Sequence, residues 1–92
     1  MTKRELIIAV AAAEGITMKE AELAVKAVFT SMERALENED RIDIRGFGSY
    51  KIKSYRSYHG RNPRTGDSML VERKKLPFFR AGKDLKERVT QG

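Results

Sequence analysis

The residues best suited to a chemical task lie between Arg45 and Gly66, and the task they suit is neutralising a polyanion. This stretch contains no acidic residue and six basic ones: Arg45, Lys51, Lys53, Arg56, Arg61 and Arg64. Tyrosines are interspersed with these charges, and an Asn-Pro pair between two glycines predicts a tight reversal. A cationic and aromatic ribbon of this kind has too few aliphatic residues to bury itself, so nucleic acid is the expected partner.

Residue types that carry catalysis or bind metals are scarce in this chain. There is one histidine, His59, and no cysteine, which excludes disulfides, thiol catalysis and cysteine-ligated zinc. We interpret His59 as a solvated residue, and Glu39, Asp40 and Asp43 as a solvated corner between a helix and a strand. The glycines at 46 and 48 precede a predicted strand, whereas a dinucleotide-binding loop must open a helix. We therefore predict no enzymatic activity, no catalytic residue, no metal and no cofactor.

Charge is distributed unevenly along the chain. Residues 1–43 carry six basic and nine acidic groups, a net charge of −3, whereas residues 44–92 carry thirteen basic and four acidic groups, a net charge of +9. A one-sided field steers polyanions toward the protein and makes their binding sensitive to salt. The second half of the chain is therefore expected to face the partner.

The length of 92 residues predicts one domain, residues 1–92. A domain this short buries only about 60–65% of the surface that its unfolded chain exposes, which favours an oligomer. The first apolar run is interrupted by Glu5 and Glu14 and lacks a cleavage site, so no signal peptide is expected. No run approaches the about 18 apolar residues of a membrane span, so we expect a cytoplasmic protein without a membrane partner.

Two helices are predicted in residues 1–40, which we interpret as the dimerisation part. Thr2–Glu5 and Thr17–Glu20 both have the capping-box pattern, and Gly15 suits the end of a helix over residues 3–14. The apolar face of the second helix is wider than one short partner helix can cover, which indicates packing on a second copy; a monomeric hairpin is the alternative. The predicted dimer core consists of Val25, Val28, Phe29, Met32, Leu36, Phe47 and Phe79.

Residues 41–82 are predicted to form a three-stranded antiparallel sheet with a protruding β-arm over about 54–74. Residues 41–45 and 49–53 alternate polar and apolar side chains, with a turn at 46–48 that tucks Phe47 beneath the sheet. Beyond Ser54 the inward positions lose their aliphatic residues, so the strand is expected to leave the globule. Pro77 marks a sheet edge or a bulge on the return. A short C-terminal helix is predicted at 83–91, which makes the fold class α+β.

The dimensions of the arm suit a DNA groove. Residues 55–62 as a strand reach roughly 26 Å, and paired strands lie about 4.8 Å apart. The minor groove is about 6 Å wide, so a two-stranded ribbon can follow it. Asn62 at the tip is able to hydrogen-bond base edges. Pro63 is interpreted either as a turn former or as a wedge that opens a base step.

Three segments resemble the HU and integration host factor family of bacterial DNA-bending proteins: GFGSY at 46–50, GRNPRTG at 60–66 and FRAGKDLKERV at 79–89. The resemblance implies a nucleoid-associated architectural protein, an intertwined dimer whose two arms enter the minor groove of double-stranded DNA. It also implies that Pro63 intercalates, that Arg61 and Asn62 enter the groove, and that the backbone at Gly46 and Gly48, with Lys83 and Lys86, contacts phosphates.

The complete set of predicted DNA contacts has an arm part and a body part. The arm part is Lys51, Lys53, Tyr55, Arg56, Tyr58, Arg61, Asn62, Arg64, Arg73, Lys74 and Lys75, with Pro63 at the tip. The body part is Lys3, Arg45, Gly46, Gly48, Arg80, Lys83 and Lys86.

The chain departs from the usual family pattern at the arm. Tyr55 and Tyr58 stand where family arms carry arginines, and Arg56 is shifted by one position, which on a strand moves its charge to the other face. RIDIRGFGS at 41–49 resembles the β subunit of integration host factor, with Arg45 matching a minor-groove arginine, whereas FRAGK at 79–83 resembles HU. The subtype, the sequence preference and the choice between homodimer and heterodimer stay open.

Two alternative functions remain. The basic arm suits an acidic protein or an anionic surface in an interaction module. The tyrosines also suit stacking on unpaired bases of RNA.

Overall fold

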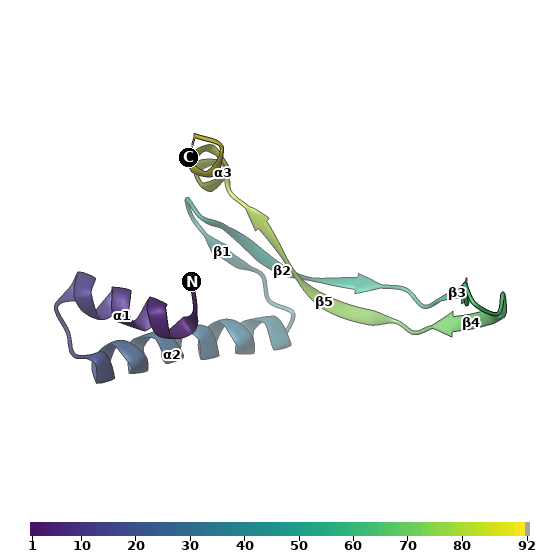
Figure 1. The fold of residues 1–92 in the computed structure, drawn as a ribbon, viewed down its shortest axis with the longest axis horizontal. Helices are drawn as coiled ribbons and strands as arrows, with labels where there is room; N and C mark the ends of the chain where they lie inside the picture. The colour runs from purple at the N-terminus through teal and green to yellow at the C-terminus, as the bar shows by residue number, and fades with distance from the viewer. Residues whose placement is uncertain (92) are drawn as a thin grey trace.

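The computed structural model describes residues 1–91 as a helical hairpin, a twisted sheet, a projecting arm and a final helix (Figure 1). In chain order the elements are α1 (Lys3–Glu14), α2 (Met18–Glu37), β1 (Ile42–Ile44), β2 (Gly48–Tyr55), β3 (Tyr58–Arg61), β4 (Ser68–Val71), β5 (Lys74–Ala81) and α3 (Lys83–Gln91). This is the predicted α+β fold, with the helical hairpin first and the short helix last.

Local hydrogen bonds set where the first two helices begin. At α2 the backbone N–H of Glu20 donates to the Thr17 hydroxyl (3.1 Å), and the Thr17 N–H donates to the Glu20 carboxylate (3.2 Å), so the predicted capping box is complete. At α1 the N–H of Glu5 donates to the Thr2 hydroxyl (3.1 Å), but the Glu5 carboxylate accepts from that hydroxyl (3.2 Å) instead of from the backbone. Gly15 ends α1 in the left-handed conformation, with φ of 64°.

The core that a single chain makes for itself is small. Ile7 and Ala11 of α1 pack on Ala21 and Val25 of α2, and these are the only buried apolar side chains in residues 1–91. Three partly buried side chains border this cluster: Leu6, Val10 and Ile16. The α1–α2 contact therefore covers one stripe of α2 and leaves its neighbouring apolar stripe open.

The sheet has the strand order β1–β2–β5, with both pairings antiparallel. Pro77 lies opposite Ile52 on the edge strand β5, and the register continues without a break on either side of this pair. The proline therefore marks an edge and not a bulge, since an edge strand tolerates a residue without an N–H.

The arm continues the β2–β5 ribbon but is not one uninterrupted ladder. Tyr55 pairs with Lys74 at the end of the sheet, and Tyr58 pairs with Val71 where the β3–β4 ribbon begins. The register is the same on both sides, so two residues on each strand are skipped without an insertion. The arm predicted as a continuous pair of strands is thus divided into an inner part and an outer part.

The arm makes the molecule much longer than a compact domain of its size. The radius of gyration is 19.1 Å and the principal extents are 59 × 33 × 28 Å. A compact chain of this length has a radius of gyration of about 12 Å. The arm runs along the longest axis and lies away from the helices (Figure 1), so its side chains are available to a partner.

Candidate nucleic-acid interface

The tip of the arm is a loop held by hydrogen bonds around Asn62. Its N–H donates to the Asp67 carbonyl (2.9 Å), and its carbonyl accepts from the Gly66 N–H (2.7 Å). Its side-chain Oδ1 accepts from the N–H of Arg64 (2.9 Å), which places Pro63 on the exposed turn between them. Gly66 has φ of 74°, a conformation that suits glycine. The Asn62 oxygen is thus used by the loop, and its amide nitrogen is the group left to donate to a base edge.

The predicted cations of the arm are exposed except for Lys53, which is half-buried, and two of them oppose each other at the interruption of the arm. Extending the register between Tyr55–Lys74 and Tyr58–Val71 sets Arg56 opposite Arg73. Tyr55 and Tyr58 are 47% and 59% exposed. Both tyrosines and Arg56 line a hollow of about 210 Å³ at this point of the arm. The two departures from the family pattern therefore meet in one place.

The inner face of the sheet, which is the face turned toward the helices, carries aromatic residues. The Phe79 ring lies 4.7 Å from that of Tyr50 and 5.5 Å from that of Phe47, centroid to centroid. Lys75, on the same face of the ribbon, is bound by Glu39 at the end of the helical hairpin, with Nζ 3.1 Å from the carboxylate. Among the arm cations, Lys75 is therefore the one with an acidic partner within residues 1–91.

The outer face of the sheet carries most of the charge. The side chains that share it on β2 and β5 are Ser49, Lys51, Lys53, Tyr55, Lys74, Leu76, Phe78 and Arg80. Four of these are cationic and none is acidic. At the β1 edge Asp43 shares this face, but its Oδ1 accepts from Arg41 Nε (2.9 Å) and from the Ser49 hydroxyl (2.7 Å). The face as a whole is therefore positive.

These hydrogen bonds change the acidity of Asp43. The Ser49 hydroxyl, and after it the Arg41 guanidinium, hold the pKa of the Asp43 carboxyl below its ordinary value. The carboxylate thus stays ionised at neutral pH, with its negative charge paired with the Arg41 guanidinium.

The turn at 46–48 is fastened to the start of α3. The Gly82 N–H donates to the carbonyl of Phe47 (2.8 Å), and the Phe47 N–H closes the turn onto Ile44 (2.9 Å). Gly46 has φ of 84°. A side chain at Gly48 would meet the Phe79 ring and the Arg80 carbonyl at 2.6 Å, so the position has no room for a Cβ atom. This turn therefore presents its backbone close to the first residues of α3.

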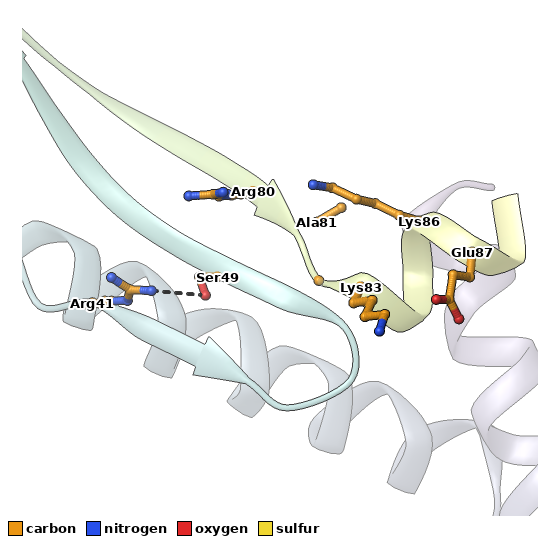
Figure 2. A pocket seen from close by; sticks show the side chains of 8 residues that line it. Arg41, Ser49, Arg80, Ala81, Lys83, Lys86 and Glu87 are labelled. Carbon is orange, nitrogen blue, oxygen red and sulfur yellow. Dashed lines mark hydrogen bonds between the residues drawn. The ribbon is translucent and has the colours of Figure 1, made fainter. Parts of the chain in front are cut away.

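A basic hollow lies beside this turn, between the end of β5 and α3 (Figure 2). It has a volume of about 480 Å³ and is lined by Arg41, Ser49, Arg80, Ala81, Gly82, Lys83, Lys86 and Glu87. Lys86 reaches back from α3 toward β5, and Arg41 donates to Ser49 across the floor at 3.4 Å (Figure 2). A neighbouring hollow of about 330 Å³ is lined partly by Arg45, Gly46 and Gly48. The predicted body residues thus lie together, except Lys3, which begins α1 and lines neither hollow.

Sequence reasoning missed Arg41 and Ser49 as parts of this flank. The alternation of residues 41–45 indicates that Arg41 and Asp43 share a face. It does not reveal that Ser49 lies opposite Asp43, which is a matter of strand register. Among residues 1–91 no cluster of three or more metal-binding side chains is present, and no helix is long and apolar enough to cross a membrane.

Five of the seven residues predicted for the dimer core lie on two surfaces of the single chain, whereas Met32 and Leu36 of α2 are half-buried and line neither surface. An apolar groove of about 220 Å³ on the helical hairpin is lined by Leu6, Val10, Ala24, Val25, Val28 and Phe29. Val28 is 57% exposed and Phe29 40% exposed. Phe47 and Phe79 form the second surface on the sheet and are 43% and 37% exposed, so Phe47 is stacked on a ring but not covered.

Comparisons with known proteins agree with this arrangement. The family described as bacterial DNA-binding protein matches residues 1–90. Integration host factor subunit beta of Histophilus somni (strain 2336) is 47% identical over 90 residues, covering 97% of this chain and 96% of the relative. The same subunit of Pseudomonas aeruginosa (strain LESB58) is 42% identical over 92 residues, covering 99% and 98%.

Solved structures share the fold. An Anabaena HU–DNA cocrystal structure matches with a TM-score of 0.88 and 33% identity over the whole of both chains. HU from Thermotoga maritima matches with a TM-score of 0.69 and 28% identity, covering 97% of this chain and 98% of that one.

Proposed function

This chain belongs to the bacterial DNA-binding family that includes HU and integration host factor, and from that premise we propose that it bends duplex DNA by entering the minor groove with two arms. As a member of this family it is an architectural DNA-binding protein and not an enzyme. The wedge that opens a base step is Pro63 of each arm, because it is the rigid, apolar residue at the exposed turn.

The observation that carries this proposal is the arm itself. Its ribbon keeps one register from Gly48–Ala81 out to Arg61–Ser68 and ends in a loop braced by Asn62. The ribbon is narrow enough to fit the minor groove, its cationic side chains complement the negative charge of DNA, and its tip is fixed and apolar. Arg61 and the Asn62 amide nitrogen donate to acceptors on its floor.

The functional unit is a dimer, formed by two copies of this chain or by this chain and a homologous subunit. One chain leaves Val28 and Phe29 of the groove exposed, together with Phe47 and Phe79 of the sheet. Exposing these apolar side chains to water is unfavourable, and a second copy that covers them stabilises the protein. A dimer also supplies the second arm, which a bend made from two kinks requires.

The basic residues beside the turn at 46–48 guide the bent duplex around the protein. Arg80, Lys83 and Lys86 gather at the basic hollow, and Arg45 adjoins it at the turn. Backbone N–H groups at the start of a helix, with cations beside them, favour phosphate. The location that follows from this function is the bacterial nucleoid, in the cytoplasm.

The decisive experiment uses the purified chain alone. Binding and bending are measured by fluorescence transfer across many random duplexes with dyes at both ends, alongside sedimentation of the protein. We expect a dimer that brings the duplex ends together. Binding without any change in end-to-end distance would contradict bending, and a monomer that binds fully would contradict the proposed assembly.

A further inference from the structure

The outer face of the sheet contains an apolar row that stays exposed in the described residues 1–91. Tyr55, Leu76 and Phe78 share this face by register and are 47%, 48% and 37% exposed. Leu76 and Phe78 lie about 6.6 Å apart along β5, because side chains of one face recur every second residue. Tyr55 lies on β2, diagonally across the strand pair from Leu76. The row runs from the sheet toward the base of the arm.

A lysine lies across the strand pair from each side chain of this row. Lys51 is the register partner of Phe78, Lys53 of Leu76, and Lys74 of Tyr55. The ammonium of Lys53 also lies diagonally over the Phe78 ring, 3.7 Å from its centroid. Each apolar side chain is thus paired with a lysine, and β2 and β5 place no acidic side chain on this face.

The aromatic residue next in sequence has a different environment. Phe79 points to the inner face and contacts the rings of Tyr50 and Phe47. Phe78 points to the outer face, where its ring meets a lysine and solvent. Phe78 is therefore exposed on the same face of the sheet that bears the positive charge.

We propose that this outer apolar row packs against the deoxyribose rings of duplex DNA while Lys51, Lys53 and Lys74 bind the flanking phosphates. The inference rests on the proposed function and adds a contact that salt does not screen. The charge of the face selects the occupant, since a DNA backbone alternates an apolar sugar edge with an anionic phosphate. A second copy of this face is excluded, because it would bring two sets of cations together.

The salt dependence of binding separates the two kinds of contact. A phosphate contact releases counterions, so each one lost changes the slope of log K against log salt by about 0.9. A sugar contact releases none. Phe78→Ala is therefore expected to weaken binding about fivefold to tenfold through lost apolar burial, with the slope unchanged. Lys51→Gln is the ionic control and is expected to lower the slope.

The affinity of each variant is measured by fluorescence anisotropy at a series of salt concentrations, with thermal unfolding and sedimentation of the same samples. Phe78→Leu, which keeps apolar bulk, is expected to retain most of the affinity. The loss caused by Phe78→Ala is also expected to persist in a Lys53→Gln background, because the ring touches the DNA itself.

The inference is overturned if Phe78→Ala binds as the parent does, if its loss appears only as a changed slope, or if the loss vanishes in the Lys53→Gln background. A shift of Phe78→Ala toward monomer would overturn it as well, by placing the ring in a subunit contact. If the parent protein itself fails to bind duplex DNA, the proposed function fails first. A parent that binds and bends DNA while Phe78 proves neutral leaves that function intact.

Discussion

Arg56 lies opposite Arg73 at the one interruption of the ladder between Gly48–Ala81 and Arg61–Ser68. Like charges directly across a strand pair destabilise the pairing, and the backbone ladder is absent here although the register continues. The arm therefore combines a fixed outer ribbon with a weakened joint, and the joint holds two cations suited to phosphates.

Replacing Arg73 by glutamate is expected to strengthen this joint in the free protein. A favourable cross-strand pair contributes about 0.2–1 kcal/mol, which is enough to raise local hydrogen-exchange protection several-fold. Arg73→Gln removes the repulsion without adding an attraction and is expected to give a smaller rise. Equal protection in the parent and both variants would show that charge does not cause the interruption. Arg73→Gln is expected to bind DNA less tightly than the parent, and Arg73→Glu less tightly than Arg73→Gln.

Pro63→Ala is expected to reduce bending more than affinity. The proline ring is the apolar wedge, whereas most of the binding free energy comes from cations that the substitution leaves in place. Fluorescence transfer between the duplex ends reports the bend, and anisotropy reports the affinity. Pro77→Ala, on the sheet edge, controls for the general loss of a proline. Equal bending by Pro63→Ala and the parent would remove the wedge from the mechanism.

Asn62→Ala is expected to loosen the arm tip, because the Arg64 N–H loses the side-chain oxygen to which it donates. Asn62→Asp retains an acceptor at the same place and is expected to keep the loop while placing a negative charge near the groove. The amide resonance of Arg64 in NMR spectra checks the loop, and DNA binding is measured in parallel. Preserved loop order in Asn62→Ala would show that the backbone bonds of the loop suffice.

Gly48→Ala is expected to destabilise the protein by about 1–3 kcal/mol, the usual cost of forcing extra volume into a packed site. The added methyl would lie 2.6 Å from the Phe79 ring and from the Arg80 carbonyl. Gly60→Ala is the control, since its Cβ would make ordinary contacts at 3.6 Å with Tyr58 and Val71. Denaturant unfolding of the three proteins gives the comparison, and equal stability of the two variants would contradict the packing role of Gly48.

Ser49→Ala is expected to raise the pKa of Asp43 toward its ordinary value, because the hydroxyl is the main cause of the lowered pKa. A carboxyl with a lowered pKa in the folded state stabilises that state above its unfolded pKa. The stabilisation is lost as pH falls below about 4 and through the folded value. An NMR titration of the Asp43 carboxyl in both proteins checks the direction. The same pKa in both would assign the effect to Arg41 instead.

Much of the fold follows from patterns within short stretches of sequence. The Thr17–Glu20 capping box, the left-handed Gly15 and the alternation of residues 49–53 each depend on residues that are near neighbours. These features were predicted correctly, as was the return of the chain along the arm. The first capping box is half formed, since the Glu5 carboxylate accepts from the Thr2 hydroxyl and not from the Thr2 backbone N–H.

The candidate site was predictable in composition but not in arrangement. The cations and the tip were evident from the sequence, whereas the hollow formed with Arg41 and Ser49 depends on bringing residues 41–49 beside residues 80–87. The apolar row likewise depends on pairing β2 with β5, since Phe78 and Phe79 are indistinguishable by residue type and differ only in the face they occupy.

The sequence by itself determined which segments become helices and strands, where the chain reverses, and which half carries the positive charge, because hydrogen bonds and side-chain periods operate over a few residues. Only the tertiary structure decided the strand register, and with it the opposition of Arg56 and Arg73, the bond from Ser49 to Asp43 and the outward direction of Phe78. The physical reason is that side chains alternate between the two faces of a strand, so a shift of one residue would exchange the faces of every side chain in it.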